Sequence, residues 1–321
     1  MLEFNMKFSV TIPAYKAKFL KEAIESVLSQ TYDNFELIIV DDNSPENLKA
    51  IVDGFSDSRI RYFRNSQNCG VVNVVDNWNI CLSYCTGDYV ICMGDDDRLL
   101  PNCLYEYLKL INKYPGIGIL HGWTEIIDEN SSVTTPTTHR CEFESAMSLA
   151  WHRFNVYHLQ FIGDFCFEKD WLLQKGGFFK LPMAWGSDDI SAIIGATKNG
   201  IANTQKVVFQ YRFNSQTITK CGDPEIKMKS VILDYQWRRA FISSKCDNEV
   251  DELYRRDLVA NFERIYNNKK AETIALDIYS KSIFRIIYWI FKRKEYLLSM
   301  KIIANSLLHY LRLELKKYKS R

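Results

Sequence analysis

The sequence predicts an α/β protein in which a doubly wound, mainly parallel sheet is followed by a C-terminal helical extension. Within the first 120 residues, short apolar runs alternate with segments whose apolar residues recur at helical spacing. The run 35–40 is almost wholly apolar, which indicates a strand buried on both faces, as in a parallel sheet. Beyond residue 222, long stretches without glycine or proline indicate helices.

The strand and helix patterns of the first part can be placed in order. Strands are expected at 8–12, 35–40, 60–63, 89–93 and 117–120, with helices at 20–28, 45–55, 71–84 and 101–113 between them. Repeated β-α units of this length place their strands parallel. The carboxyl ends of the strands therefore meet at one edge of the sheet, where open α/β sheets bind ligands.

We expect two domains. Residues 1–222 form the first, with halves at about 1–120 and 121–222, and residues 223–321 form a helical, basic region. The 321 residues are 47% hydrophobic and 25% charged with a net charge of +2, which is the composition of an ordinary globular protein. The charge is unevenly distributed, because eleven Lys or Arg oppose only two Glu between Lys281 and Arg321.

Two acidic turns follow predicted strands, Asp41-Asp42 and Asp95-Asp96-Asp97. Adjacent carboxylates repel one another, and the repulsion grows as water is excluded, so a cation is expected at the triplet. Mg²⁺ or Mn²⁺ suits such a site because hard divalent ions take carboxylate and phosphate oxygens as ligands. The alternative is a solvated acidic turn that caps the helix beginning near Pro101.

Several function classes are disfavoured. The first strand is followed by P-A-Y-K instead of G-x-G-x-x-G, and the chain contains no G-x-x-x-x-G-K-[ST]. A bound nucleotide would then be held by carboxylates and a metal. Nine cysteines without a C-x-x-C pair, the absence of a secretory signal and the lack of an 18-residue apolar run predict a cytoplasmic protein with reduced thiols. His121 and His158 are expected as satisfied core or surface histidines.

Several motifs in a fixed order carry a family resemblance. The runs S-V-T-I-P-A-Y-K and A-I-E-S-V-L-S-Q-T-Y-D-N-F-E-L-I-I-V-D-D-N-S resemble the N-terminal region of family 2 glycosyltransferases, which have the GT-A fold. N-C-G, G-D-Y-V, D-D-D-R-L-L-P, G-G-F-F and W-G-S-D-D-I continue the match, which covers roughly residues 6 to 220. The resemblance implies transfer of a sugar from a nucleotide-sugar to an acceptor hydroxyl, mostly with inversion.

The resemblance also implies a nucleotide site. Asp42 matches the carboxylate that accepts a hydrogen bond from the uracil ring, whereas Asp41 is expected to point the other way and orient the turn. Near the diphosphate, Asn214 stands where many relatives have a histidine. The nucleotide-binding residues expected in this way are Pro13, Ala14, Tyr15, Asp42, Arg64, Asn68, Asp95 and Arg212.

The same comparison places Mn²⁺ or Mg²⁺ at Asp96, with Asp97 beside it. Many relatives have an aspartate two positions before the metal ligand, where this chain has Gly94. Because alternate residues of an extended segment point to opposite sides, we expect Asp96 to point away from Asp95 and Asp97. The protein would then supply one direct ligand, and the diphosphate would supply much of the rest.

On the acceptor side, Asp188 and Asp189 occupy the position of the acidic pair that carries the general base, and Asp189 is chosen as the base. The alternative is that this pair caps the helix that follows it. Gly177 is expected in a turn near the donor sugar. Trp185 could stack on a sugar face, although core packing is the alternative for its indole.

Beyond residue 222, helices are expected at 226–241, 248–267, 271–291 and 296–317. Their basic charge, together with Tyr288, Trp289 and Tyr310, is typical of a tail on an anionic membrane surface. The alternative is a helical appendage that packs on protein. Nucleic-acid binding is not expected, because no basic-aromatic motif of a known module is present.

These observations predict a metal-dependent, inverting glycosyltransferase with a UDP-sugar as donor. Its acceptor would be a saccharide or lipid-linked saccharide in cell-surface polysaccharide synthesis, at the inner face of the cell membrane. One alternative is a non-catalytic member that binds a nucleotide-sugar or tethers partners. The other is a sugar nucleotidyltransferase, which is disfavoured because P-A-Y-K-A-K lacks the glycine-rich loop that such an enzyme needs.

Overall fold

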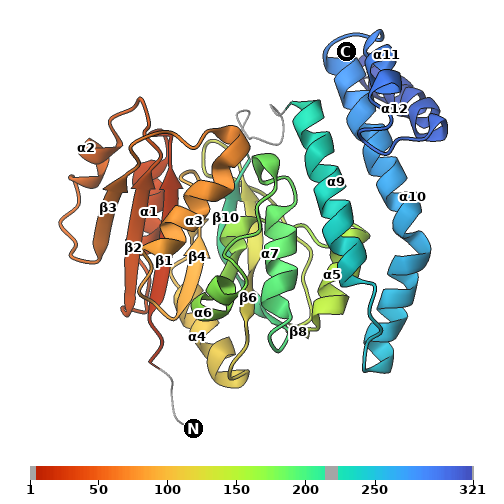
Figure 1. Ribbon diagram of the computed structural model, residues 1–321. Coiled ribbons are helices and arrows are strands. Elements are labelled where there is room, and N and C mark those ends of the chain that lie inside the picture. The colour runs from red at the N-terminus through yellow and green to blue at the C-terminus, as the bar shows by residue number, and fades with distance from the viewer. Residues whose placement is uncertain (1–4, 214–222, 320–321) are drawn as a thin grey trace. The chain divides into compact units, whose positions relative to one another are not determined.

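A computed structural model describes residues 5–213 and 223–319 of the chain (Figure 1). The chain divides into two compact units, Met1–Lys180 with Ser187–Thr217, and Leu181–Gly186 with Ile218–Arg321. The boundary predicted at residue 222 lies outside the described residues and stays a prediction, as does the prediction for Asn214. Each unit is described here by itself.

The first unit is built on one mixed sheet with the strand order β3-β2-β1-β4-β9-β6-β10-β5. Strands β3, β2, β1 and β4 are parallel, β9 runs antiparallel between β4 and β6, and β10 is again parallel to β6. This mostly parallel sheet with surrounding helices confirms the predicted fold class. The strands are β1 (Phe8–Ala14), β2 (Phe35–Asp41), β3 (Ile60–Arg64), β4 (Tyr89–Cys92), β5 (Arg98–Leu99), β6 (Ile119–Ile127), β7 (Val133–Pro136), β8 (Phe143–Glu144), β9 (Phe165–Glu168) and β10 (Ile201–Arg212).

The helices of this unit lie close to the predicted positions. The helix expected at 71–84 begins as a single 3₁₀ turn, η1 (Val71–Asn73), and continues as α3. The remaining short turn is η2 (Ile162–Asp164). The α-helices are α1 (Leu20–Leu28), α2 (Leu48–Val52), α3 (Val74–Ser83), α4 (Cys103–Lys113), α5 (Ala146–Phe154), α6 (Lys169–Gln174) and α7 (Ser187–Ala196).

Strand β2 shows why its sequence is apolar throughout. Leu37 and Ile39 belong to the large core that also contains residues of α1 and α4. Ile38 and Val40 point to the opposite face and pack in a second cluster with Cys81 of α3. Full burial of one such side chain stabilises the fold by roughly 1.5–3 kcal/mol. Burial on both faces therefore requires the uninterrupted apolar run.

The parallel strands end together at one edge of the sheet. Ala14 at the end of β1 pairs with Asp41 at the end of β2, and Asp41 pairs in turn with Arg64 at the end of β3. Strand β4 lies parallel to β1 on its other side and leads directly into the acidic triplet. Residues far apart in sequence are thereby aligned at the edge where a ligand site was predicted.

The second unit is helical. It contains the turn η3 (Pro182–Ala184) and the helices α9 (Pro224–Phe241), α10 (Glu249–Ser280), α11 (Arg285–Phe291) and α12 (Met300–Lys319). A break between two helices was predicted between residues 267 and 271. This prediction is wrong, because α10 is one continuous helix of 32 residues that includes them. Ala271 and Ile274 are fully buried there, and this packing outweighs the weak helix preference of the neighbouring asparagines.

Trp289 lies in the core of this unit. Its side chain is fully buried, and its indole N–H donates to Asp277 Oδ2 at 2.8 Å. Tyr288 and Tyr310 are partly buried against the same cluster. The aromatic residues predicted to meet a membrane thus contribute to the internal packing of the unit. Among residues 5–213 and 223–319, no helix combines the length and the apolar content needed to cross a bilayer.

Candidate functional site

The turn after β2 is held by Asp41. Its carboxylate is fully buried, with Oδ1 accepting from the Ser44 backbone N–H at 2.7 Å. Oδ2 accepts from the Tyr62 hydroxyl at 2.6 Å and from Arg64 Nη1 at 3.0 Å. Arg64 also donates to the Ser44 carbonyl at 2.9 Å. Asp41 was predicted to orient this turn and Arg64 to bind the nucleotide. In the structure the two side chains bind each other and stabilise the turn.

Asp42 organises the loop after β3. Its Oδ1 accepts from the Cys69 backbone N–H at 2.9 Å and from Asn65 Nδ2 at 2.8 Å. Asn68 Nδ2 donates to the Asp42 carbonyl at 2.7 Å, and the Asp42 N–H donates to the Ala14 carbonyl at 2.9 Å. The structure therefore brings together Ala14, Asp42 and Asn68, which were predicted from three separate stretches of sequence.

Asp95 joins the end of β1 to the acidic triplet. Its Oδ2 accepts from the backbone N–H groups of Tyr15 and Lys16, each at 2.7 Å. Burial and the neighbouring charge of Asp96 raise the pKa of Asp95 to about 6, although these two hydrogen bonds oppose the shift. Tyr15 remains 44% exposed, so one face of its ring is available to a ligand.

Asp96 and Asp97 converge near Gly94. A Cβ atom on Gly94 would lie 2.9 Å from Asp97 Oδ2 and 3.0 Å from Asp96 Oδ1. The predicted opposite directions of Asp96 and Asp97 are therefore wrong. The reason is that residues 94–97 form a turn, with the Asp97 N–H directed at the Gly94 carbonyl at 3.4 Å, and strand alternation does not apply. Burial and Asp96 raise the pKa of Asp97 well above its usual range.

Arg212, at the end of β10, stabilises the turn of residues 94–97 by hydrogen bonds. Its backbone N–H donates to Asp97 Oδ1 at 2.9 Å, and its Nε donates to the Asp96 carbonyl at 2.8 Å. Nη1 donates to the Asp128 carbonyl and Nη2 to Glu22, both at 2.9 Å. The side chain is fully buried. The phosphate contact predicted for Arg212 would require some of these bonds to break.

The second acidic group begins α7. Asp189 is 7% exposed, and its Oδ1 accepts from Arg153 Nε at 2.5 Å and from Gln160 Nε2 at 2.8 Å. Burial and the charge of Asp189 raise the pKa of Asp188 to about 7, while Arg153 opposes the shift. Arg153 and Gln160 therefore hold the Asp189 carboxylate in one orientation at the start of α7.

Tyr211 connects the two acidic groups. Its ring stacks on Phe161 with centroids 3.6 Å apart and planes within 8° of parallel. Burial raises the pKa of the Tyr211 phenol, and the negative charges of Asp97, Asp96 and Asp188 raise it further. Phe161 directly follows Gln160, which donates to Asp189, and Tyr211 directly precedes Arg212, whose backbone N–H donates to Asp97. The two stacked rings therefore link the acidic pair to the acidic triplet within the first unit.

The comparison with known proteins identifies the family. A family model described as "Glycosyl transferase family 2" matches residues 9–173. The chain belongs to this family. This chain is 35% identical over 126 residues to the UDP-Glc:alpha-D-GlcNAc-diphosphoundecaprenol beta-1,3-glucosyltransferase WfgD of Escherichia coli, a match covering 39% of this chain and 48% of that protein.

Two further comparisons agree. The chain is 34% identical over 131 residues to the uncharacterized glycosyltransferase MJ1057 of Methanocaldococcus jannaschii, covering 39% of this chain and 44% of that protein. The match thus spans about half or less of these relatives. The structure of S. aureus TarS 1-349 in complex with UDP-GlcNAc superposes with a TM-score of 0.63 at 14% identity, covering 97% of this chain and 92% of that chain. This likeness confirms the GT-A-like fold.

Gly177 and Trp185 were predicted to contact the sugar or the acceptor. Gly177 has a φ of +86°, and a Cβ there would lie 2.4 Å from Asn79 Oδ1, so glycine allows the turn to pack on α3. Trp185 belongs to the second unit, where the Lys227 ammonium lies 4.5 Å from its ring centroid. No described contact links Gly177 to the acidic groups, and both sugar contacts stay predictions.

Sequence reasoning missed the groups that position the acidic residues. Arg153 and Gln160 lie 36 and 29 residues before Asp189, and no spacing rule connects them. Tyr211 could have been found, because it directly precedes Arg212 at the end of a predicted binding segment. Phe161 carries no motif. These residues are recognised only from the contacts that the fold creates.

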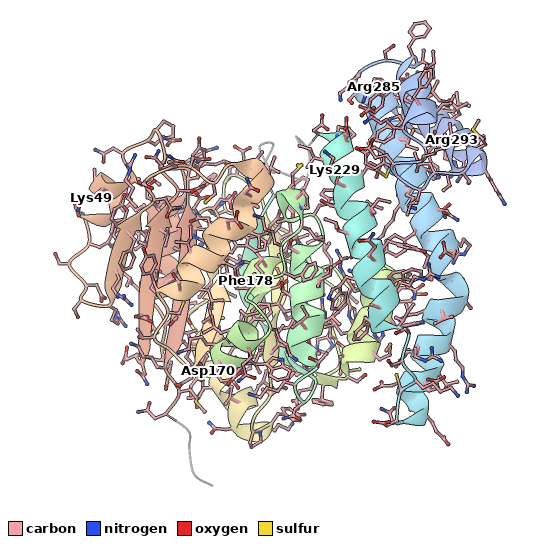
Figure 2. All side chains as sticks on the ribbon, in the orientation of Figure 1. Lys49, Asp170, Phe178, Lys229, Arg285 and Arg293 are labelled. Atoms are coloured by element: carbon pink, nitrogen blue, oxygen red, sulfur yellow. The ribbon has the colours of Figure 1, made fainter. Side chains whose placement is uncertain are left out.

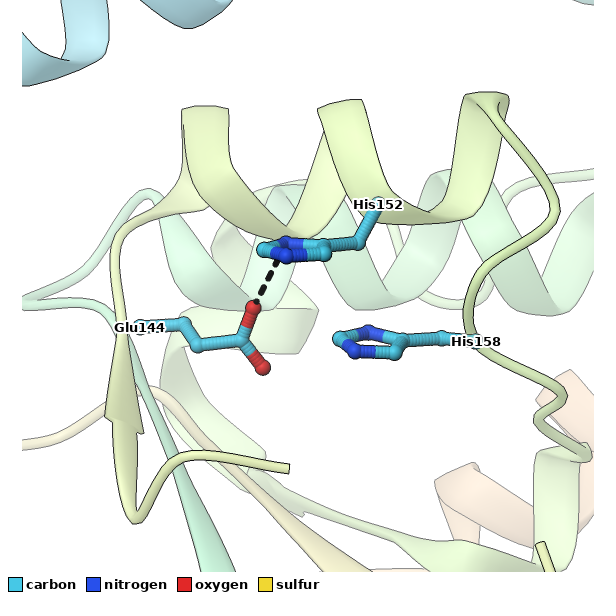
Figure 3. Close-up of side chains that lie close together, drawn as sticks. All are labelled: Glu144, His152 and His158. Carbon is cyan, nitrogen blue, oxygen red and sulfur yellow. Dashed lines mark ion pairs between the residues drawn. The ribbon is translucent and has the colours of Figure 1, made fainter. Parts of the chain in front are cut away.

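A second cluster could hold a cation within the described part of the chain. Glu144, His152 and His158 offer ligand atoms within 4.8 Å of one another (Figure 3). Glu144 Oε2 lies 3.2 Å from His152 Nδ1, but the two imidazole planes are stacked within 8° of parallel. Their in-plane lone pairs do not converge, so a metal would require a ring to turn. Burial and Arg140 lower the pKa of His158 to about 2.

Proposed function

We propose that this glycosyltransferase transfers a sugar from a UDP-sugar to a hydroxyl of a saccharide or lipid-linked saccharide, with inversion. The observation that carries the proposal is the chain of contacts through Phe161 and Tyr211 that links the acidic pair to the acidic triplet. The relative WfgD is named for UDP-Glc and a diphosphoundecaprenol-linked GlcNAc, and TarS has been solved with UDP-GlcNAc and with UDP. These names support a uridine donor and a lipid-linked acceptor.

The nucleotide would occupy the edge formed by the ends of β1, β2 and β3. Pro13, Ala14 and the exposed Tyr15 would border the base, and Asp42 would offer an acceptor to the uracil N–H. The Asp42 carboxylate is already oriented by Cys69 and Asn65, so little reorganisation is needed. Arg64 and Asn68 would then fix the surrounding loops.

Asp96 and Asp97 would hold Mn²⁺ or Mg²⁺. Each has a carboxylate oxygen within about 3.0 Å of the position of a Cβ on Gly94, and burial together with the charge of Asp96 raises the pKa of Asp97. A cation bound between them would stabilise the ionised carboxylates. When bound, the ion supplies charge stabilisation to the departing nucleoside diphosphate. Asp95 would stay bonded to Tyr15 and Lys16 and keep the triplet next to the nucleotide edge.

Asp189 would act as the general base. A proton acceptor must be ionised and held in place, and the bonds from Arg153 and Gln160 provide both conditions. Burial and the charge of Asp189 raise the pKa of the neighbouring Asp188 to about 7, so Asp188 would also accept a proton within this site. The acceptor hydroxyl would lose its proton to Asp189 as it attacks the anomeric carbon of the sugar.

A turnover assay with separate nucleotide-binding and transfer readouts tests this function. UDP-sugars are incubated with Mn²⁺ and saccharide or polyprenyl-diphosphate-linked acceptors, and UDP release and glycosylated product are both measured. Asp189→Asn is compared with Asp170→Asn, a matched control whose side chain is 73% exposed on α6. Activity that Asp189→Asn removes and Asp170→Asn retains is the expected result.

The non-catalytic alternative rests on Gly94, which replaces an aspartate found in many relatives. It predicts UDP-sugar binding without UDP release or transfer, whatever acceptor is supplied. Calorimetric binding of UDP combined with an absence of product across the donor and acceptor panel would favour this alternative and overturn the enzymatic one.

The site of action would be the inner face of the cell membrane, where a polyprenyl-linked acceptor is presented. The basic C-terminal helices support this placement, because anionic lipids attract clustered Lys and Arg. Co-sedimentation of the protein with cell membranes, reversed by high salt, is expected.

A further inference from the structure

Helix α11 exposes an apolar face that internal packing does not use. Phe284 and Phe291, at its two ends, are 75% and 82% exposed. Ile287 between them is 50% exposed, and the three follow the i, i+3, i+7 spacing of one helix face. Ile283 and Ile290 extend the same face at 42% and 36% exposure. A continuous outward face of large apolar side chains therefore runs along the helix.

The opposite face of α11 is firmly anchored. Trp289 is fully buried and bonded to Asp277, and Arg285 Nε donates to the same carboxylate at 2.7 Å. The Arg285 guanidinium also lies 3.9 Å from the Tyr288 ring centroid. These contacts determine which side of α11 points outward, so its exposed face is a consequence of the packing of the unit.

The surroundings of this face are basic. Arg293 and Lys294 follow Phe291, both are exposed, and neither forms an ion pair with any residue in the described ranges. Arg285 and Arg293 are labelled on the C-terminal helices in Figure 2. Helix α12 adds an exposed apolar row, Met300, Leu308, Leu311 and Leu315, with exposed Lys301 and Arg312 beside it. Apolar side chains flanked by free cations match the chemistry of an anionic lipid surface.

We propose that α11 is the element that binds this protein to an anionic bilayer, with Phe284, Ile287 and Phe291 entering the interface and Arg293 and Lys294 meeting lipid phosphates. This inference deepens the proposed function by naming the surface that would bring the site to a lipid-linked acceptor. A second copy of the chain is disfavoured as the occupant, because two basic faces would repel each other. The bilayer matches both the apolar face and its charge.

Vesicle binding by the full chain tests the proposal. Co-sedimentation is measured with phosphatidylcholine vesicles and with vesicles that also contain phosphatidylglycerol. The double variant Phe284→Ser/Phe291→Ser is expected to bind the anionic vesicles at least about tenfold more weakly, because two aromatic side chains no longer enter the interface. Arg293→Gln/Lys294→Gln is expected to weaken binding by about fivefold per cation removed.

The matched control is Val250→Ser/Leu253→Ser on α10, which removes two apolar side chains that are 61% and 64% exposed in an acidic stretch. Near-UV circular dichroism, to which the buried Trp289 contributes, checks folding. UDP release in solution is measured in every variant, so failure of the membrane surface is distinguished from failure of the active site. This soluble activity is expected to be unchanged.

Two outcomes would overturn the proposal. One is equal vesicle binding by the phenylalanine variant and the α10 control. The other is a change in oligomeric state of the phenylalanine variant, measured by light scattering, without a change in vesicle binding, which would assign the face to a second copy of the chain. Equal binding to neutral and anionic vesicles would also contradict the role given to Arg293 and Lys294.

Discussion

Two acidic turns follow parallel strands at one edge of the sheet, Asp41-Asp42 and Asp95-Asp96-Asp97. Their sequences are similar, but their carboxylates have different surroundings. Asp41 and Asp42 follow β2, and their carboxylates accept hydrogen bonds from backbone and side-chain donors in the surrounding loops. Asp95 and Asp97 follow β4, and burial raises the pKa of both. Asp95 and Asp97 also accept backbone hydrogen bonds. The first turn therefore supports a loop, and the second is the turn proposed to hold a cation.

The largest effect should come from the second turn. Replacing Asp96 and Asp97 together by asparagine is expected to lower kcat by about 10²–10³ or more, because the developing charge on the diphosphate loses its cation. Initial rates with a UDP-sugar and Mn²⁺ measure the loss. The surface variant Asp170→Asn should keep its rate, and an unchanged rate in the double variant would remove the cation site from the mechanism.

The free energy of unfolding should depend more on the first turn, Asp41-Asp42, than on the turn that contains Asp97. Asp41→Asn is expected to lower the free energy of unfolding by about 2–3 kcal/mol, because hydrogen bonds to a buried charged group are lost. Asp97→Asn is expected to leave stability unchanged or raise it in the presence of a chelator, because it removes a repelled charge. Urea denaturation of both variants with EDTA compares them. Equal destabilisation would show that both turns are structural.

The pH dependence follows from the raised pKa values. A carboxyl whose folded pKa lies above its unfolded value binds protons more tightly in the folded state, so it stabilises the fold as pH falls. The metal-free protein should therefore become more stable as pH falls from about 8 to 7, because burial raises the pKa of Asp164 to about 8 and that of Asp188 to about 7. Below about pH 6.5, Asp95, with a pKa of about 6, acts in the same sense, whereas His158, whose pKa burial lowers to about 2, acts against it. Urea denaturation across this range measures the change.

Addition of Mn²⁺ should reverse this trend at the triplet, because protons and the cation compete for the same carboxylates. The rise in Tm caused by Mn²⁺ should be largest at high pH and should shrink as pH falls, because burial and the charge of Asp96 raise the pKa of Asp97 well above its usual range. Differential scanning fluorimetry across this range, with Asp96→Asn/Asp97→Asn as control, measures the effect. A rise that is independent of pH would contradict binding at the triplet.

The smallest effect is expected at Gly94. Gly94→Ala should weaken Mn²⁺ binding only a fewfold, because the atoms that its Cβ would meet are the ends of the Asp96 and Asp97 side chains, which can turn. Gly118→Ala is the contrasting variant, since its Cβ would lie 2.3 Å from the Gly195 carbonyl and must displace backbone. Calorimetry with Mn²⁺ and thermal unfolding compare the two. A complete loss of metal binding in Gly94→Ala would show that the turn cannot relax.

Much of the first unit could be predicted because its signals are local. Apolar runs in β1, β2 and β4 predict buried strands, and acidic residues follow two of them, β2 and β4, at the edge where a ligand site was predicted. The reversed strand β9 and the continuous helix α10 could not be predicted in this way. Strand direction in β9 depends on pairing with β4 and β6, and the continuity of α10 depends on the core that buries Ala271 and Ile274.

The sequence by itself determined the family, the parallel strands and the order of the acidic motifs, because each can be recognised from short runs of neighbouring residues. Only the tertiary structure decided how those residues are used. It directed Asp96 and Asp97 to the same side of a turn, paired Asp189 with Arg153, enclosed Trp289 and left Phe284 and Phe291 exposed. These outcomes depend on contacts between distant segments, and no local pattern of residues encodes such contacts.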